Sequence, residues 1–152
     1  KIQFERVQTL INVGIDEGAT LLCGGPGKPE GFENGWFVKP TIFKDVTNDM
    51  KIAKEEIFGP VLVIIPFKDE EEAIHVGNDV VYGLAAGVWT QNIRRAMVMA
   101  DRLEAGTVWV NTYRAVSYMS PFGGYKQSGH GKDMGLAGFE KYRKKKAVWI
   151  QS

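Results

Sequence analysis

The chain has 152 residues, of which 44% are hydrophobic and 24% charged, and its formal net charge is +1. This composition is typical of one soluble globular domain, and no apolar run approaches the roughly 20 residues that cross a bilayer. A charge so close to neutral gives no general attraction to nucleic acid or membranes, so we expect neither as a partner. With no signal-peptide pattern and a single cysteine, Cys23, the chain suits a reducing, cytoplasmic compartment.

A helical pattern begins at the first residue. Apolar side chains recur on one face at three- and four-residue steps, at Phe4, Val7, Leu10, Ile11 and Ile15. Gly18 is a good C-terminal stop. Because the pattern starts at Lys1 with no lead-in and no initiator Met, we expect a piece cut from a longer protein.

Three extended segments follow the first helix. Ala19 to Cys23 predicts a short buried strand with the cysteine at its end. Trp36 to Phe43 predicts an edge or irregular strand, because Pro40 cannot donate to a ladder. The continuous apolar run from Leu62 to Ile65, within the segment Val61 to Phe67, predicts a strand buried on both faces of a parallel sheet.

The second half of the chain alternates between helices and strands. Asp69 with Glu72 predicts a capping box, which assigns the intervening acids to a first helical turn rather than to a metal site. Leu84 to Thr90 predicts a strand, Asn92 a cap for a helix over Ile93 to Ala105, and Thr107 to Asn111 the next strand. This order predicts an α/β fold with a mostly parallel sheet and crossover helices.

The C-terminal part of the chain has less periodicity. From Thr112 to about Gly138 glycines are dense and no pattern is clear, which indicates a functional or disordered loop. Lys144 to Gln151 predicts a final strand. The basic cluster before it, from Lys141 to Lys146, would suit phosphate or nucleic acid, but we favour a solvated helix end and a protected strand edge. Steeply salt-dependent association would distinguish nucleic-acid binding.

The sequence does not match most of the short motifs that have a known chemistry. The stretch Ser128 to Gly135 places its third glycine one residue late for a dinucleotide fingerprint, and a P-loop would need a glycine at Lys126. Neither Cys23 nor the two histidines, His75 and His130, has a legible nucleophile or base partner. We assign no catalytic residue within the chain, and we find no metal-ligand set.

The segment EEIFGPV, beginning at Glu55, is the most informative. Residues two apart in an extended segment point the same way, so Glu56 and Phe58 would share a side. A carboxylate can accept from two adjacent ribose hydroxyls, and an aromatic face can pack on a heterocycle. The alternative is that the carboxylates cap a turn or pair with Lys51 or Lys54.

The whole chain resembles the C-terminal third of the aldehyde dehydrogenase superfamily. LLCGG, WFVKPTIF, KEEIFGPVLVI, YGLAAGVWT, AGTVWVN and SPFGGYKQSGHGKDMG stand in that family's order and spacing. Lys132-Asp133 departs from the Arg-Glu of many members and loses the arginine fork. The resemblance implies that residues 1–140 are part of the catalytic domain and that 141–152 form an oligomerisation strand of a homo-dimer or homo-tetramer.

The resemblance also implies roles for individual residues. Glu56 would bind the nicotinamide ribose of NAD or NADP, and Phe58 would pack near the nicotinamide. Phe122 would line the aldehyde tunnel, whose variable part would contain Arg114 and Val116. A cation at 114 would suit an aldehyde with a distal carboxylate, although a surface or paired arginine is the commoner situation.

The family's reaction uses groups that the resemblance places upstream of Lys1. A cysteine thiolate attacks the aldehyde, the thiohemiacetal transfers a hydride to NAD(P)+, and a glutamate-activated water hydrolyses the thioester while an asparagine helps to bind the oxyanion. Cys23 falls in LLCGG and is not that nucleophile. We therefore expect the chain alone to be inactive and to need the remainder of its own polypeptide. The alternative is a non-catalytic assembly or regulatory module that keeps the fold.

Overall fold

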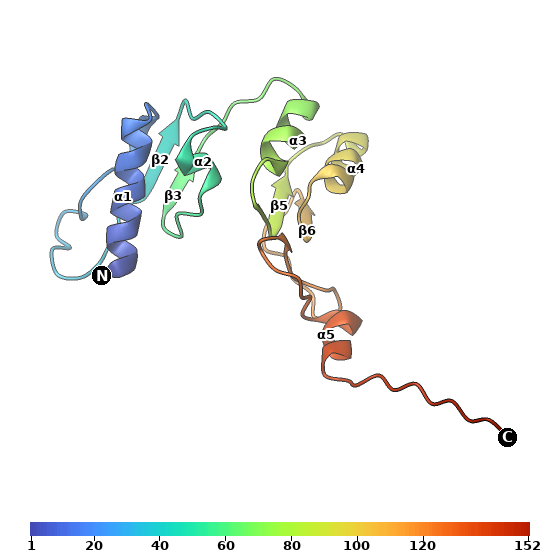
Figure 1. The fold of residues 1–152 in the computed structure, drawn as a ribbon. Helices are drawn as coiled ribbons and strands as arrows, with labels where there is room; N and C mark the ends of the chain where they lie inside the picture. The colour runs from blue at the N-terminus through green and yellow to red at the C-terminus, as the bar shows by residue number, and fades with distance from the viewer. The chain divides into compact units, whose positions relative to one another are not determined.

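The computed structural model describes residues 1–152, and the chain divides into two compact units, Lys1–Asp69 and Glu70–Ser152. Both units combine helices with short paired strands, which confirms the predicted α/β class (Figure 1). Among the helices, none combines the length and the apolar character needed to span a bilayer. The predicted boundary between residues 140 and 141 concerns assembly and stays a prediction.

The first unit packs one long helix on a three-stranded sheet. It contains α1 (Ile2–Asp16), β1 (Thr20–Cys23), β2 (Thr41–Lys44), α2 (Lys51–Lys54) and β3 (Val61–Val63). The central strand β2 pairs antiparallel with β1 and parallel with β3. The predicted helix and the predicted parallel pairing are therefore present.

The core of this unit lies between α1 and β2. Ile11 of α1 and Phe43 of β2 are both 0% exposed, and Ile52 of α2 packs against them. Ile57, which follows α2, is buried in the same cluster. Burial of such side chains contributes about 1.5–3 kcal/mol each, so the segment around Ile57 is firmly attached to the core.

Burial of the strands in this unit was predicted wrongly. Leu62 in β3 is 57% exposed and Ile64 is 45% exposed, so the run is not covered on both faces. All four residues of β1, including Cys23, are exposed. Both strands lie at the edges of the sheet, and in β3 only Val61 and Val63 contact the core.

The second unit is built around a parallel strand pair. It contains α3 (Glu70–Asn78), β4 (Tyr82–Gly83), β5 (Ala85–Val88), α4 (Ile93–Arg102), β6 (Thr107–Val110), β7 (Tyr125–Lys126) and α5 (Gly135–Lys141). β5 pairs parallel with β6, and α4 connects them, as predicted. β4 pairs antiparallel with β7. The predicted cap is present, because Asn92 Oδ1 accepts from the Arg95 N–H at 3.1 Å.

Glutamates in the first turn of α3 join this helix to α4. Arg95 Nε donates to Glu70 at 2.5 Å, and the Arg102 guanidinium binds the Glu71 carboxylate through both of its terminal nitrogens. The predicted assignment of Glu70 and Glu71 to a helical first turn is confirmed. A bidentate pair of this kind is stronger and more directional than a simple ion contact.

Several predicted boundaries differ from the structure. The strand predicted from Trp36 begins only at Thr41, after Pro40, and α4 ends at Arg102 rather than Ala105. The segment predicted as irregular contains β7 and the start of α5. These short elements are defined by contacts with distant segments, which local periodicity does not report.

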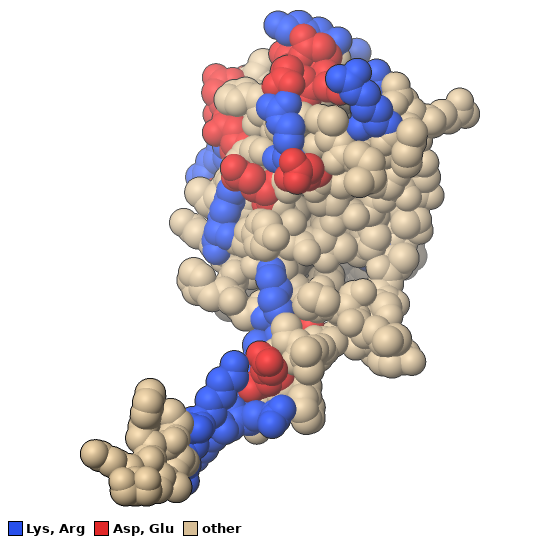
Figure 2. All heavy atoms as spheres, turned by 90° about the vertical axis from the view of Figure 1, so that its right-hand side faces the viewer, with Lys and Arg blue, Asp and Glu red and all other residues tan.

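The C-terminal segment forms no strand within the chain. Residues 143–152 lack regular structure, so the strand predicted over Lys144 to Gln151 is not formed here, because nothing in the chain pairs with it. Basic side chains gather along this segment and are followed by an uncharged end (Figure 2). That end exposes Val148, Trp149 and Ile150 by 71%, 93% and 89%.

Candidate functional site

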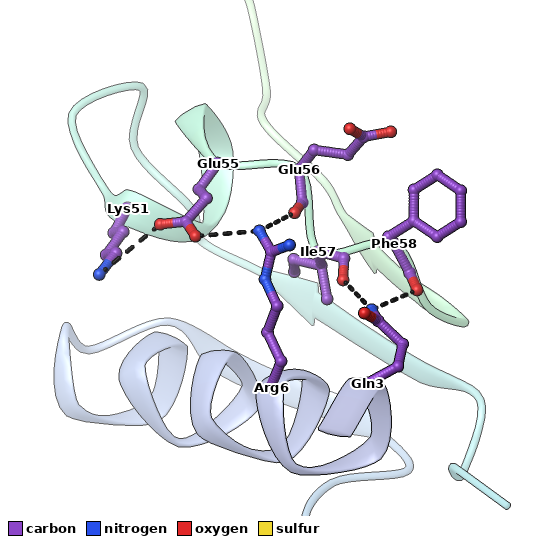
Figure 3. A network of polar contacts seen from close by, with 7 residues as sticks. All are labelled: Gln3, Arg6, Lys51, Glu55, Glu56, Ile57 and Phe58. Atoms are coloured by element: carbon purple, nitrogen blue, oxygen red, sulfur yellow. Dashed lines mark hydrogen bonds and ion pairs between the residues drawn. The ribbon is translucent and has the colours of Figure 1, made fainter. Parts of the chain in front are cut away.

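The segment that leads into β3 is fastened to α1 through its main chain. Gln3 Nε2 donates to the carbonyl oxygens of Ile57 at 3.1 Å and Phe58 at 2.9 Å (Figure 3). Arg6 Nη2 donates to the main-chain oxygen of Glu56 at 2.9 Å. Three successive carbonyls are thus held by two side chains of one helix, which fixes the direction of the segment.

The two adjacent glutamates have different surroundings. The Glu55 carboxylate pairs with Arg6 at 3.1 Å and with Lys51 at 3.6 Å. The Glu56 carboxylate has no partner in the chain and points away from α1 (Figure 3). The alternative of pairing with Lys51 is therefore correct for Glu55, and Glu56 remains available to a ligand.

Phe58 is held in an unusual backbone conformation. Its φ is 54°, in the left-handed region that non-glycine residues seldom adopt, and its side chain is 74% exposed. The next residue, Gly59, lies so close to α1 that an added Cβ would come within 2.8 Å of Val7. Strained backbone with an exposed aromatic is typical of a binding segment rather than of packing.

Glu56 and Phe58 line one hollow of the first unit. The hollow has a volume of about 330 Å³ and is also lined by Gly59, Val61 and Leu62. Both side chains point away from α1, whereas Ile57 between them is buried (Figure 3). The structure therefore brings together the two residues that the sequence selected.

A second hollow lies in the second unit, and it is lined by the other site residues that the sequence analysis selected. Its volume is about 510 Å³, and Arg114, Val116 and Phe122 all line it. The remaining lining comes from β5, β6 and the loop after β6: Leu84, Ala85, Ala86, Gly87, Trp109 and Tyr113. The part of β5 in this lining consists of small residues, Ala85 to Gly87.

Phe122 is held by contacts on both sides of its loop. Its N–H and carbonyl exchange two hydrogen bonds of 2.8 Å with the main chain of Asp133. Lys132 Nζ donates to the carbonyls of Gly123 at 2.6 Å and Gly124 at 2.9 Å. The ammonium also lies 4.4 Å from the centre of the Tyr125 ring. The aromatic side chain is therefore presented by a braced turn.

The loop after β6 is braced by aromatic and amide contacts. Trp109 Nε1 donates to the Ala115 carbonyl at 2.7 Å, and its ring meets Tyr113 edge-on at 5.6 Å. The Asn111 side chain exchanges two hydrogen bonds of 2.8 Å with the main chain of Thr90. These contacts join the ends of β5 and β6 and start the loop in a fixed direction.

Sequence reasoning missed the residues that position these sites. Gln3 and Arg6 carry no motif, because their partners are main-chain carbonyls more than 45 residues away. Trp109 and Tyr113 could have been found, since aromatic residues beside a variable loop are common in apolar binding sites. Cys23 lies at 3.8 Å from the Pro40 carbonyl oxygen and contacts neither hollow.

Comparison with known proteins gives a consistent result. The model described as the aldehyde dehydrogenase family matches residues 1–148. An aldehyde dehydrogenase of Emericella nidulans is 51% identical over 148 residues, which are 97% of this chain and 29% of that protein. A 3-succinoylsemialdehyde-pyridine dehydrogenase of a Pseudomonas species is 50% identical over 147 residues, covering 97% of this chain and 31% of that protein.

Solved structures agree with these relatives. The indole-3-acetaldehyde dehydrogenase AldA of P. syringae, a cysteine-to-alanine mutant bound to NAD+ and IAA, superposes with a TM-score of 0.94 at 47% identity, over 100% of this chain and 30% of that one. A Pseudomonas syringae AldC mutant bound to NAD+ and octanal superposes with a TM-score of 0.89 at 50% identity. The match covers 93% of this chain and 29% of that one. The chain therefore spans about 30% of the length of the relatives it matches.

Proposed function

This chain belongs to the aldehyde dehydrogenase family, and we propose that it forms the C-terminal third of an NAD(P)+-dependent enzyme that oxidises an aldehyde to a carboxylic acid. The observation that carries the proposal is the unpartnered Glu56 carboxylate, which lines one hollow with Phe58. The complexes of related enzymes with NAD+ support the choice of cofactor.

The carboxylate and the aromatic ring of this hollow fit the ribose and ring of a nicotinamide nucleotide. An ionised carboxylate accepts only, so two neighbouring ribose hydroxyls are its natural donors. The exposed face of Phe58 can pack on the nicotinamide ring. When bound, the nucleotide supplies the oxidising power of the reaction. Gln3 and Arg6 orient the carboxylate by holding the main chain of residues 56–58.

The hollow of the second unit would receive the aldehyde. Phe122 and Val116 offer an apolar wall, and the bonds from Lys132 and Asp133 hold the main chain that carries the phenyl ring. Apolar walls exclude water from a reacting carbonyl and orient a hydrocarbon chain. This assignment remains separate from that of the nucleotide, since each hollow is built by its own unit.

The chemical steps would depend on groups outside this chain. The only thiol, that of Cys23, lies in neither hollow, so we propose that the nucleophile, the general base and the oxyanion asparagine come from upstream polypeptide. The exposed apolar end at Val148, Trp149 and Ile150 would pair with another subunit in a homo-dimer or homo-tetramer. An upstream sequence without a nucleotide-binding domain would instead favour a non-catalytic module.

The experiment is aldehyde-dependent reduction of NAD+ and NADP+ by the full-length protein, with Glu56→Gln as the variant. Loss of the acceptor should raise KM for the nucleotide by about tenfold, because a hydrogen bond to a charged group is worth about 1.5–3 kcal/mol. Glu30→Gln is the matched control, because Glu30 is an exposed carboxylate of the same unit outside the hollow. No nucleotide reduction with any aldehyde would contradict the proposed function.

A further inference from the structure

Arg114 differs from the arginines that stabilise the fold. Arg6, Arg95 and Arg102 each pair with a glutamate, at distances of 3.1 Å for Arg6 and 2.5 Å for Arg95. Arg114 has no hydrogen bond and no carboxylate partner, and its only contact of this kind is with the Tyr113 ring, 5.1 Å from Cζ to the ring centre. Its guanidinium therefore keeps all of its donors for a ligand.

The position of Arg114 is set by its neighbours. Its φ is 58°, so the main chain turns sharply at this residue. Tyr113 below it meets Trp109 edge-on, and Trp109 also holds the Ala115 carbonyl at 2.7 Å. The residues on both sides of Arg114 are thus attached to β6, which lowers the entropy that the main chain of the loop loses when Arg114 binds an anion.

The surroundings of Arg114 make it the only charged group of the hollow. Every other lining residue is uncharged, and no Asp or Glu lines this hollow or the adjoining one that shares Val116 and Phe122. The exposed guanidinium of Arg114 therefore meets no competing carboxylate in this lining, and the side chains beside it are mainly apolar. An apolar body with one anionic end is the ligand that matches this arrangement.

We propose that Arg114 binds the distal carboxylate of an aldehyde substrate, so that the enzyme prefers aldehydes with an acidic group at the far end. The planar guanidinium can hold a carboxylate through two parallel hydrogen bonds, which a neutral aldehyde cannot use. The hydrocarbon between the two ends would lie along Val116 and Phe122. This inference rests on the proposed oxidation of an aldehyde.

The test compares kcat/KM of the full-length enzyme for 4-oxobutanoate and for its neutral methyl ester, with NAD+ in excess. The native enzyme should prefer the acid by about tenfold or more, and Arg114→Gln should remove that preference, because kcat/KM should fall about tenfold further for the acid than for the ester. Arg114→Lys should retain part of the preference for the acid, since lysine keeps the positive charge but cannot form the two parallel hydrogen bonds of a guanidinium. Raising the salt concentration should lower the preference of the native enzyme.

Arg94→Gln is the matched control, because Arg94 is an exposed arginine of the same unit that lies outside the hollow. It should leave the ratio of the two kcat/KM values as it is. An equal preference in native enzyme and Arg114→Gln, with unchanged melting temperature, would overturn the role of Arg114. Oxidation of the ester alone would overturn the acidic substrate but keep the proposed function. Oxidation of neither compound by an enzyme that oxidises other aldehydes would have the same meaning, whereas no reduction of NAD+ with any aldehyde would overturn both proposals.

Discussion

The guanidinium of Arg6 donates to the main-chain oxygen of Glu56 at 2.9 Å and, from the same nitrogen, to the Glu55 carboxylate at 3.1 Å. One helix side chain thus holds the segment and neutralises Glu55, which lines the hollow together with Glu56. The neighbouring carboxylate of Glu56 is left without a partner. This division of roles explains why two adjacent glutamates can lie beside a core.

Removing the Arg6 side chain should weaken nucleotide binding without removing any nucleotide contact. In Arg6→Ala the Glu56 carbonyl would lose its donor, while Gln3 and the burial of Ile57 would still hold the following residues. We expect KM for NAD+ to rise by about threefold to tenfold with a smaller change in kcat. Steady-state kinetics of the full-length enzyme measures both. Lys1→Ala is the control, because Lys1 contacts only Glu5 at 3.6 Å on the surface of α1. An unchanged KM in a folded variant would show that Arg6 does not position Glu56.

The ammonium of Lys132 should be needed for the shape of the hollow that we propose to receive the aldehyde. Lys132→Met leaves the half-buried carbonyls of Gly123 and Gly124 without their donor, which costs about 1–3 kcal/mol. We expect a lower melting temperature and a higher KM for the aldehyde, both partly restored in Lys132→Arg. Lys144→Met, in the exposed C-terminal segment, should change neither. Normal aldehyde KM in Lys132→Met would contradict the bracing of Phe122.

The contact between α3 and α4 should make stability depend on pH in the acid range. The hydrogen bond from Arg102 lowers the pKa of Glu71 below its ordinary value of 4.5. A carboxyl group with a lowered folded-state pKa stabilises the protein above the unfolded pKa, and this contribution is lost as the pH falls through the folded value. Glu71→Gln should therefore lower the melting temperature near about pH 7 and have little effect near about pH 2.

A double-mutant cycle with Arg102→Gln isolates this pair from other effects of pH. The coupling should be modest and should decrease with added salt, because both side chains are solvent-accessible. A coupling that is equal at acid and neutral pH would show that the ion pair does not cause the pH dependence.

Local patterns predicted the parts of the fold that are fixed locally. The periodicity of α1, the Asn92 cap and the crossover from β5 to β6 are all present, because each depends on neighbouring residues. The prediction that Leu62 is buried was wrong, because burial depends on distant residues rather than on neighbouring ones. An apolar run indicates that a face can be buried, but what covers that face is decided by distant polypeptide.

The candidate sites could be predicted only in part. Glu56, Phe58 and Phe122 were selected from their motifs, and the structure shows which of them share a hollow. The backbone strain at Phe58 and the braces from Gln3 and Lys132 were not predictable, because they depend on main-chain carbonyls brought close by folding. Side-chain chemistry can be read from a sequence, whereas such positioning contacts need coordinates.

The most direct test of the central claim pairs Glu56 with the ribose hydroxyls. Affinity for NAD+ and for an analogue that lacks both hydroxyls of the nicotinamide ribose is measured by titration calorimetry, in the full-length enzyme and in Glu56→Ala. The native enzyme should bind the analogue about tenfold more weakly than NAD+, and Glu56→Ala should bind the two equally. An equal loss of affinity for the analogue in both proteins would show that the carboxylate of Glu56 does not contact this sugar.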